Sequence, residues 1–131
     1  MVGLDTNVLV RFLVRDDEGQ FARARRLIQK GAAGGEPVLI SLLVLLETEW
    51  VLRSCYGLAK SEIAAAFAGL LQSSELLFED EASIEQALYI WKDASAQFAD
   101  CLIGARYWAL GCRATASFDV RALRLPDFIA V

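Results

Sequence analysis

The chain has 131 residues, of which 56% are apolar and 23% are charged, and its formal net charge at pH 7 is −4. This length and composition predict one folded domain spanning residues 1–131 and exclude a disordered chain. The net charge has the wrong sign for a protein that holds a polyanion by its overall field, so any contact with nucleic acid must come from a local patch. The chain contains no histidine, which excludes Ser-His-Asp and Cys-His catalysis and argues against a zinc site.

The cysteines and the N-terminus indicate where the protein resides. Cys55, Cys101 and Cys112 are odd in number, lack C-x-x-C spacing and have apolar neighbours, so we expect small buried side chains in a reducing compartment. The N-terminus shows neither a basic lead nor a cleavage site, which predicts no signal peptide. The longest apolar run, residues 38–46, is shorter than the roughly 20 residues that a membrane span needs. We therefore expect a cytoplasmic protein without a membrane segment.

Short apolar runs alternate with helical patterns along the first part of the chain. A first strand is predicted at residues 2–4, and Thr6 or Asn7 is expected to cap the helix that follows it. The next helix carries an apolar face and is expected to end among the glycines of residues 31–35. A strand at residues 38–40 then leads into a largely buried helix, which Ser41 caps and which runs to about residue 56.

The second part of the chain repeats this alternation. Ser61 is expected to open a helix, residues 76–78 to form a strand, and Asp80 to cap a helix that carries Trp91. A further helix is predicted at about residues 98–110, a strand at 113–116 and a last edge strand at 128–131. No internal repeat or linker interrupts this order. The pattern predicts the α/β class, with helices on both faces of a central, mostly parallel sheet of four to five strands.

Four carboxylates, Asp5, Glu47, Asp100 and Asp119, lie in stretches that otherwise read as protein interior. Asp5 and Asp119 follow the carboxyl ends of predicted parallel strands, where open α/β sheets bind ligands. Asp100 lies in the first turn of its helix, where the positive end of the helix dipole favours a negative charge. Glu47 lies about two turns into the helix that follows the second strand. The four acids can therefore converge on one edge of the sheet.

Spacing discriminates between the two glutamates of that helix. Glu49 has Arg53 four residues later, which is the favourable orientation for a surface ion pair. Glu47 has no basic residue at either helical pairing distance and shares its face with Leu43 and Trp50. We therefore prefer Glu47 as the functional acid.

A purely structural role remains open for the three aspartates. Asp5 could serve only as a helix cap, and Asp100 could be a simple charge at a helix start. Asp119 could cap a short helix, or Arg121 or Arg124 could neutralise it.

Other side chains divide into candidate substrate contacts and structural residues. The candidates for phosphate contacts are Arg11, Arg15, Arg53, Arg121 and Arg124, with Arg11, Arg15 and Arg121 preferred. The residues expected only to solubilise their helix are Arg23, Arg25 and Arg26. The tryptophans expected in the core rather than in base stacking are Trp50, Trp91 and Trp108.

The convergence of four acids has a chemical consequence. Two carboxylates about 4 Å apart repel each other by roughly 4 kcal/mol at an effective dielectric constant near 20. A divalent cation relieves this repulsion, and ligands that offer only oxygen select a hard ion such as Mg²⁺ or Mn²⁺. Such an ion lowers the pKa of bound water and offsets charge on a reacting phosphate, so hydrolysis of a phosphodiester is the reaction predicted.

Four short segments, spread over nearly the whole chain, carry these acids. They read Gly3-Leu4-Asp5-Thr6-Asn7-Val8-Leu9-Val10, Leu46-Glu47 leading into Trp50-Val51-Leu52, Phe98-Ala99-Asp100-Cys101-Leu102-Ile103 followed by Gly111, and Ser117-Phe118-Asp119 before Leu125-Pro126. In this order they resemble the motifs of the PIN-domain ribonucleases, and among these the VapC-like toxins of bacterial toxin–antitoxin pairs.

The resemblance implies a PIN-like domain with Asp5, Glu47, Asp100 and Asp119 as its catalytic and metal-binding quartet. The polar residues implied as support are Asn7, Ser117 and Thr6. It further implies a Mg²⁺- or Mn²⁺-dependent endoribonuclease that cuts single-stranded RNA, acts as a toxin, forms a homodimer and is neutralised by a cognate VapB-like antitoxin. Serine at position 117 and cysteine at position 101 stand where the family more often has threonine and alanine, and both changes conserve size.

Three other classes of protein share some of these features. A haloacid-dehalogenase-type phosphatase, which is Mg²⁺-dependent, needs a second aspartate where this chain has Asn7. A receiver domain needs adjacent acids after its first strand and a lysine at a late strand end, and the chain has neither. A catalytically silent, PIN-like interaction module, whose carboxylates receive a basic segment of a partner, remains open.

Overall fold

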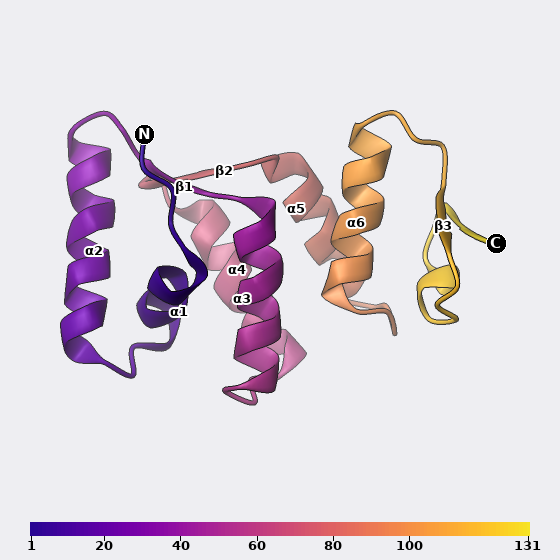
Figure 1. The fold of residues 1–131 in the computed structure, drawn as a ribbon, viewed down its shortest axis with the longest axis horizontal. Coiled ribbons are helices and arrows are strands. Elements are labelled where there is room, and N and C mark those ends of the chain that lie inside the picture. The colour runs from indigo at the N-terminus through magenta and orange to yellow at the C-terminus, as the bar shows by residue number, and fades with distance from the viewer. The chain divides into compact units, whose positions relative to one another are not determined.

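The computed structural model describes residues 1–131, which form two compact units, residues 1–79 and residues 80–131. Figure 1 shows the helices and strands of both units. Each unit combines helices with one pair of parallel strands. The predicted α/β class with parallel strands is therefore confirmed.

The first unit contains four helices and one strand pair. These are α1 (Thr6–Val14), α2 (Glu18–Ala33), β1 (Val38–Ile40), α3 (Leu42–Ser54), α4 (Lys60–Gln72) and β2 (Leu76–Phe78). Strand β1 pairs in parallel with β2, and Leu39 is level with Leu77. The strand expected at residues 2–4 is reduced to a single parallel bridge between Gly3 and Leu39.

Helix α1 begins one residue earlier than the sequence suggested. Asp5, rather than Thr6 or Asn7, caps the helix, because its Oδ1 accepts a hydrogen bond of 2.8 Å from the backbone N–H of Thr6. Helix α2 continues through Gly31 and ends only at Ala33. A glycine inside a helix weakens it without necessarily ending it, which explains the longer helix.

The predicted cap is right for helix α3 and wrong for helix α4. Ser41 caps α3 as predicted, and its Oγ accepts a hydrogen bond of 3.1 Å from the N–H of Val44. Helix α4 is not opened by Ser61. Its cap residue is Ala59, whose backbone N–H donates a hydrogen bond of 3.0 Å to the side chain of Glu62. A carboxylate three residues into a helix can satisfy the cap residue in this way.

Apolar side chains from all the helices of the first unit form its core. Helix α1 contacts both α2 and α3, and α4 contacts α3 and β2. The largest fully buried side chains of this unit are Phe67, Leu9, Ile40, Leu45, Leu52 and Ile63. This packing places the start of α1 and the start of α3 on one framework.

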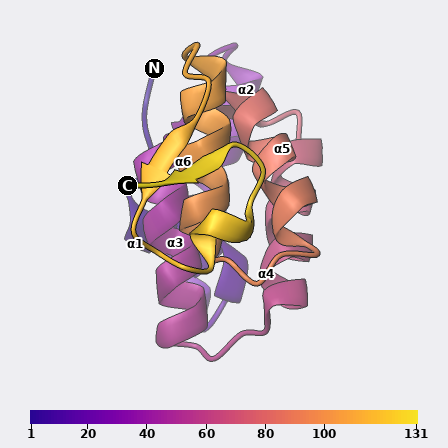
Figure 2. The ribbon, with the colours of Figure 1, turned by 90° about the vertical axis from the view of Figure 1, so that its right-hand side faces the viewer.

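The second unit has two packed helices and a second strand pair. It contains α5 (Glu81–Trp91), α6 (Phe98–Ala109), β3 (Thr115–Ser117), the short 3₁₀ helix η1 (Ala122–Arg124) and β4 (Phe128–Ala130). Figure 2 shows η1 and the two strands beside α6. A Cβ atom on Gly104 of α6 would lie 2.6 Å from the Phe128 ring. Glycine at this position therefore lets β4 approach the helix closely.

Strand pairing differs from the prediction in extent. The four strands form two parallel pairs, β1 with β2 and β3 with β4, in place of the expected single sheet of four to five strands. Each strand has only three residues, and strand β3 begins at Thr115 rather than at residue 113. Such short strands pair through few ladder hydrogen bonds, so helix packing supplies most of the core.

Two of the three tryptophans are not in the core. Trp91 is buried and packs against Phe98 with ring centroids 5.1 Å apart. Trp50 and Trp108 expose 54% and 55% of their surface. The prediction of a core position is wrong for these two, because helical spacing alone does not say which face of a helix meets the core.

The cysteines also depart from expectation. Cys101 is buried, whereas Cys55 and Cys112 are exposed. The prediction of three buried side chains is thus right for one cysteine only. No helix of the chain combines the length and the apolar character that crossing a membrane requires.

Candidate active site

Asp5 and Glu47 are the two candidate acids of the first unit. Asp5 lies two residues after Gly3, and Ser41 lies two residues after Leu39, with which Gly3 is paired in parallel. Asp5 is therefore level with the cap of α3. Glu47 lies six residues beyond that cap, about 9 Å along the helix axis. Since α1 and α3 are in contact, the two acids belong to neighbouring elements.

Neither Asp5 nor Glu47 is buried. Both are exposed, and Glu47 shares its face of α3 with Leu43 and Trp50, which expose 78% and 54% of their surface. Asp119 is exposed as well, and Asp100 is half-buried. The expectation that the four acids lie in the interior is therefore wrong, because their neighbours are apolar but the acids stand at helix starts, in a loop and on a solvent-facing side.

Glu49 is the buried acid of α3. It is only 3% exposed, and its Oε2 accepts a hydrogen bond of 2.8 Å from Nε of Arg53. A second contact of 3.4 Å joins Oε1 to Nη2. The predicted ion pair is thus confirmed, although the acid lies inside rather than on the surface. The hydrogen bond from Arg53 to Glu49 raises the pKa of the guanidinium.

The two acids of the second unit are held by backbone amides. Oδ2 of Asp100 accepts a hydrogen bond of 3.2 Å from the N–H of Gln97, which precedes α6. Oδ1 of Asp119 accepts from the N–H groups of Arg121, at 2.8 Å, and Ala122, at 3.3 Å. The N–H of Asp119 donates to Oγ of Ser117 at 3.0 Å. Asp100 thus accepts from the cap residue of α6, and Asp119 accepts from the backbone at the start of η1.

Hydrogen bonds to the backbone leave part of each of these carboxylates available. In Asp5, Asp100 and Asp119, the hydrogen bonds use one oxygen and leave the other without a partner. Each side chain is therefore fixed through one oxygen and offers the second to a ligand. The structural role and the functional role proposed from the sequence are compatible.

Asp100 and Asp119 lie within electrostatic reach of each other. Burial raises the pKa of Asp100 above its ordinary value, the hydrogen bond from Gln97 lowers it, and the negative charge of Asp119 raises it further. Neither acid forms an ion pair, with Arg121, with Arg124 or with any other base, and Arg106 pairs with Asp80 at 2.8 Å. The second unit therefore contains two carboxylates that repel each other.

None of the four candidate acids forms an ion pair. The acids that do form ion pairs are Asp16, Glu18, Glu36, Glu49 and Asp80. Within either unit, no three acidic or cysteine side chains gather into a group that could hold a metal ion. The structure thus brings Asp100 and Asp119 together, whereas the convergence of all four acids stays a prediction.

Two of the arginines preferred as phosphate contacts are engaged within the first unit. Arg11 donates from Nε to Gln20 at 2.6 Å and from Nη1 to the hydroxyl of Tyr56 at 2.7 Å, and it forms an ion pair of 3.3 Å with Asp16. The hydrogen bond to Tyr56, followed by the charge of Asp16, raises the pKa of Arg11. Arg15 pairs with Glu18 and lies over the ring of Phe21. Both side chains therefore stabilise the α1–α2 turn.

Two exposed side chains, Phe118 and Arg23, were not singled out from the sequence as contacts. Phe118 exposes 83% of its surface next to Asp119. Arg121, the third preferred phosphate contact, is exposed without an ion pair. Arg23, which the sequence suggested to be a solubilising residue, lines a groove together with Asn7, which lies two residues after Asp5. The sequence could have indicated Phe118 as a contact, because this residue stands directly before a candidate acid in a loop.

The substitution Asp100→Asn is expected to stabilise the metal-free protein at neutral pH. The raised pKa means that the folded state binds this proton more tightly than the unfolded chain does. The resulting destabilisation is absent below the unfolded pKa, sets in as pH rises towards the folded pKa, and persists above it. Asparagine keeps an oxygen for the N–H of Gln97. We expect a Tm about 2 °C higher near pH 7 in chelator, and no difference near pH 3.

Differential scanning calorimetry at both pH values measures this change. An unchanged or lower Tm at neutral pH would show that the charge of Asp100 is not under strain in the folded protein.

The family model for the PIN domain matches residues 2–127. The match runs through both compact units and contains all four candidate acids. No curated protein matches the chain.

Proposed function

The chain belongs to the PIN-domain family, and from that premise we propose that it is a Mg²⁺- or Mn²⁺-dependent endoribonuclease that hydrolyses phosphodiester bonds of single-stranded RNA. The family consists typically of nucleases, and its members generally use divalent metal ions. The observation that supports the proposal best is the pair Asp100 and Asp119. These two carboxylates repel each other, and no arginine or lysine neutralises them.

The chemistry of the donors fits a hard divalent cation. Asp5, Glu47, Asp100 and Asp119 are the residues that would hold it, and they offer only oxygen atoms. None of the four forms an ion pair, and each aspartate keeps one oxygen free of hydrogen bonds. A bound Mg²⁺ or Mn²⁺ ion would make water more acidic and offset negative charge on the phosphate.

The residues around the acids orient them. The N–H of Thr6 holds one oxygen of Asp5, and the N–H of Gln97 holds one oxygen of Asp100. Ser117 supports Asp119 by accepting a hydrogen bond from its backbone N–H. A carboxylate held in this way can accept the proton of the attacking water at a fixed position. We assign Asn7 and Ser117, with Thr6, to the support of the site.

The direct test incubates the purified chain with transfer RNA and ribosomal RNA, in Mn²⁺, in Mg²⁺ and in chelator. We expect cleavage products with either metal ion and none in chelator. If no metal-dependent product forms on any RNA, the catalytically silent interaction module becomes the better description. Hydrolysis of phosphate monoesters without cleavage of RNA would instead point to a phosphatase.

The proposal includes a biological role as the toxin of a toxin–antitoxin pair, with a cognate VapB-like antitoxin, a homodimeric state and a cytoplasmic location. Exposed apolar side chains on one face of α6 support the homodimer: Ile103 and Tyr107 in the helix and Leu110, which caps its C-terminus, expose 42%, 45% and 60% of their surface. Light scattering measures the oligomeric state. Growth arrest on expression, relieved by the product of the neighbouring open reading frame, tests the toxin role.

A further inference from the structure

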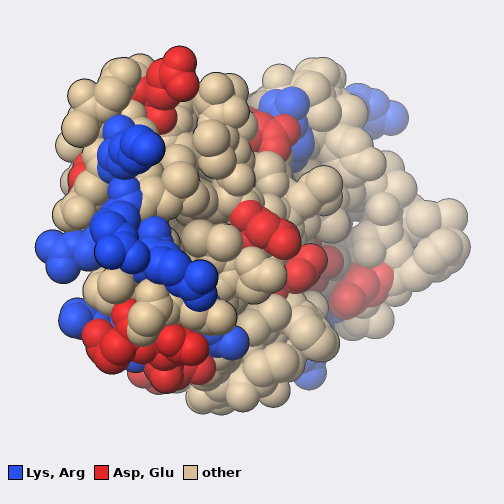
Figure 3. Space-filling model, turned by 60° about the vertical axis from the view of Figure 1, so that its left-hand side comes forward, with Lys and Arg blue, Asp and Glu red and all other residues tan.

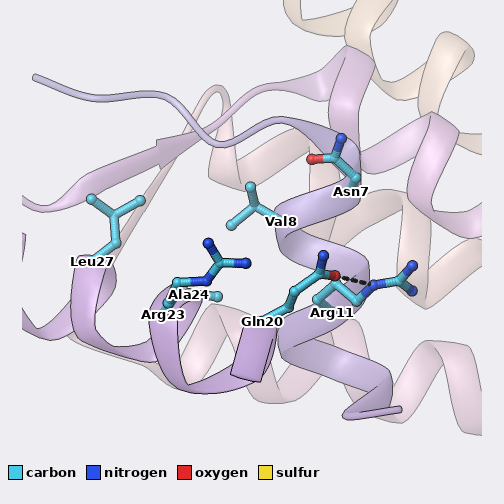
Figure 4. Close-up of a pocket in the computed structure, with 7 residues that line it drawn as sticks. All are labelled: Asn7, Val8, Arg11, Gln20, Arg23, Ala24 and Leu27. Carbon is cyan, nitrogen blue, oxygen red and sulfur yellow. Dashed lines mark hydrogen bonds between the residues drawn. The ribbon is translucent and has the colours of Figure 1, made fainter. Parts of the chain in front are cut away.

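A groove of about 430 Å³ lies between α1 and α2 in the first unit. Figure 4 shows its lining, with Val8 and Leu27 as apolar walls and with the polar side chains of Asn7, Gln20 and Arg23 around them. Arg11 also lines the groove and is bonded to Gln20 at 2.6 Å. No carboxylate is among the lining residues. The groove therefore combines apolar surface with a positive charge and amide groups.

Arg23 is the cation that this groove leaves available. Arg11 is compensated by Asp16, with which it forms an ion pair. Arg23 is exposed and forms no ion pair or hydrogen bond, and its guanidinium points towards Val8 (Figure 4). An uncompensated guanidinium next to amide groups binds an anion, above all a phosphate, which it can contact with two N–H groups.

Further positive charge continues along the same side of α2. Arg26 and Lys30 lie three and seven residues after Arg23, so the three share a face of the helix, and both are exposed. Figure 3 shows Lys and Arg side chains gathered over this part of the first unit. The chain as a whole carries a net charge of −4, so a local patch of this kind is what contact with a polyanion requires.

The groove also begins near a candidate acid of the nuclease site. Asn7, which lines it, lies two residues after Asp5 in the same unit. A strand of RNA with a phosphodiester at Asp5 can therefore continue along α1 towards Arg23. Sugars or bases can pack against Val8 and Leu27 while the phosphates face the guanidinium.

We propose that the α1–α2 groove binds the backbone of single-stranded RNA beside the cleaved bond, with Arg23 as its phosphate contact. The inference rests on the proposed ribonuclease function and deepens it, since it assigns a binding site for the flanking strand. A groove that offers N–H donors, a free arginine and no acid favours this polyanion over a protein segment.

The experiment compares Arg23→Gln with Arg25→Gln in the full chain. Arg25 is exposed on the same helix but does not line the groove, so it controls for the loss of one positive charge. The probe is a fluorescein-labelled single-stranded RNA dodecamer, whose affinity is measured by anisotropy in chelator and whose cleavage is measured in Mn²⁺. Because Arg23 is exposed and unpaired, neither variant is expected to alter the fold.

We expect Arg23→Gln to weaken binding and raise KM by roughly tenfold, as the loss of one charge-assisted contact would. The slope of log affinity against log salt should fall by about 0.7, the value for one phosphate of a single strand. The turnover number kcat should stay unchanged, because Arg23 contacts the flanking strand rather than the reacting phosphate. Arg25→Gln should change affinity by less than about twofold.

The two proposals fail in different ways. Equal affinity, salt slope and KM for Arg23→Gln and the unaltered chain would overturn the groove assignment, whether or not RNA is cut. Binding that depends on Arg23 without metal-dependent cleavage would keep the groove and remove the nuclease. If Arg23→Gln left RNA binding unchanged but prevented neutralisation by the product of the neighbouring open reading frame, the groove would belong to a protein partner instead.

Discussion

The substitution Asp5→Asn is expected to abolish metal-dependent cleavage of RNA while leaving the fold intact. Asparagine caps a helix as well as aspartate does, and its oxygen can still accept the 2.8 Å hydrogen bond from the N–H of Thr6. What disappears is the negative charge and the free oxygen, both of which a divalent ion requires. We expect kcat/KM to fall by at least about 10²-fold, with no change in Tm, in assays with Mn²⁺.

Asp17→Asn provides a matched control in the same unit. Asp17 caps α2 through a hydrogen bond of 3.0 Å from the N–H of Gln20 to Oδ1, so it makes the same kind of contact at another helix start. It is not one of the four candidate acids, and we expect its variant to cleave RNA at least as fast as the unaltered chain. Equal losses in both variants, or full activity in Asp5→Asn, would remove Asp5 from the site.

Local chemistry made several helix starts predictable. Ser41 and Asp80 were recognised as caps because a side chain that can accept a hydrogen bond stands directly before an apolar helical pattern, and both caps are confirmed. The cap of α1 was expected at Thr6 or Asn7, with Asp5 left open as an alternative, since all three are good caps. The bridge between Gly3 and Leu39 determines which residue is the cap, because Asp5 is the first residue after the hydrogen bonds of this bridge.

The side of α3 that meets the core was not predictable in the same way. Thr48 and Glu49 are buried, at 0% and 3% exposure, while Trp50 is exposed. Apolar residues surround this helix on every side, so periodicity gives no clear inner face. The ion pair between Glu49 and Arg53 allows the acid to lie inside, and this pairing was visible in the sequence spacing although the burial was not.

All four candidate acids were selected because they stand in stretches that read as protein interior, and Glu47 in addition because helical spacing gave it no basic partner. The structure agrees on the lack of a basic partner, since none of the four forms an ion pair. The arginines were harder to assign, because partners such as Tyr56 are distant in sequence from Arg11. The groove lined by Arg23 exists only through the packing of α1 on α2, which no local pattern encodes.

The variant Glu47→Gln is expected to lose activity but not stability, and Glu49→Gln is expected to lose stability. Glu47 is exposed and unpaired, so its neutral variant should keep its Tm but lose about 10²-fold or more in kcat/KM with Mn²⁺. Glu49 is buried and bonded to Arg53. Its variant weakens that pair and should destabilise the fold by about 1 kcal/mol, because the partly exposed guanidinium can turn to water. Tm should fall by about 4 °C.

Activity per folded molecule decides between the two glutamates. Chemical denaturation gives the folded fraction of each variant, and cleavage rates at a temperature well below both transitions are divided by that fraction. The chemical change is the same in both variants and the positions are two residues apart on one helix, so each serves as the control for the other. If Glu49→Gln lost cleavage while fully folded and Glu47→Gln retained it, Glu49 would be the second acid, and its bond to Arg53 would have to open before a metal ion could bind.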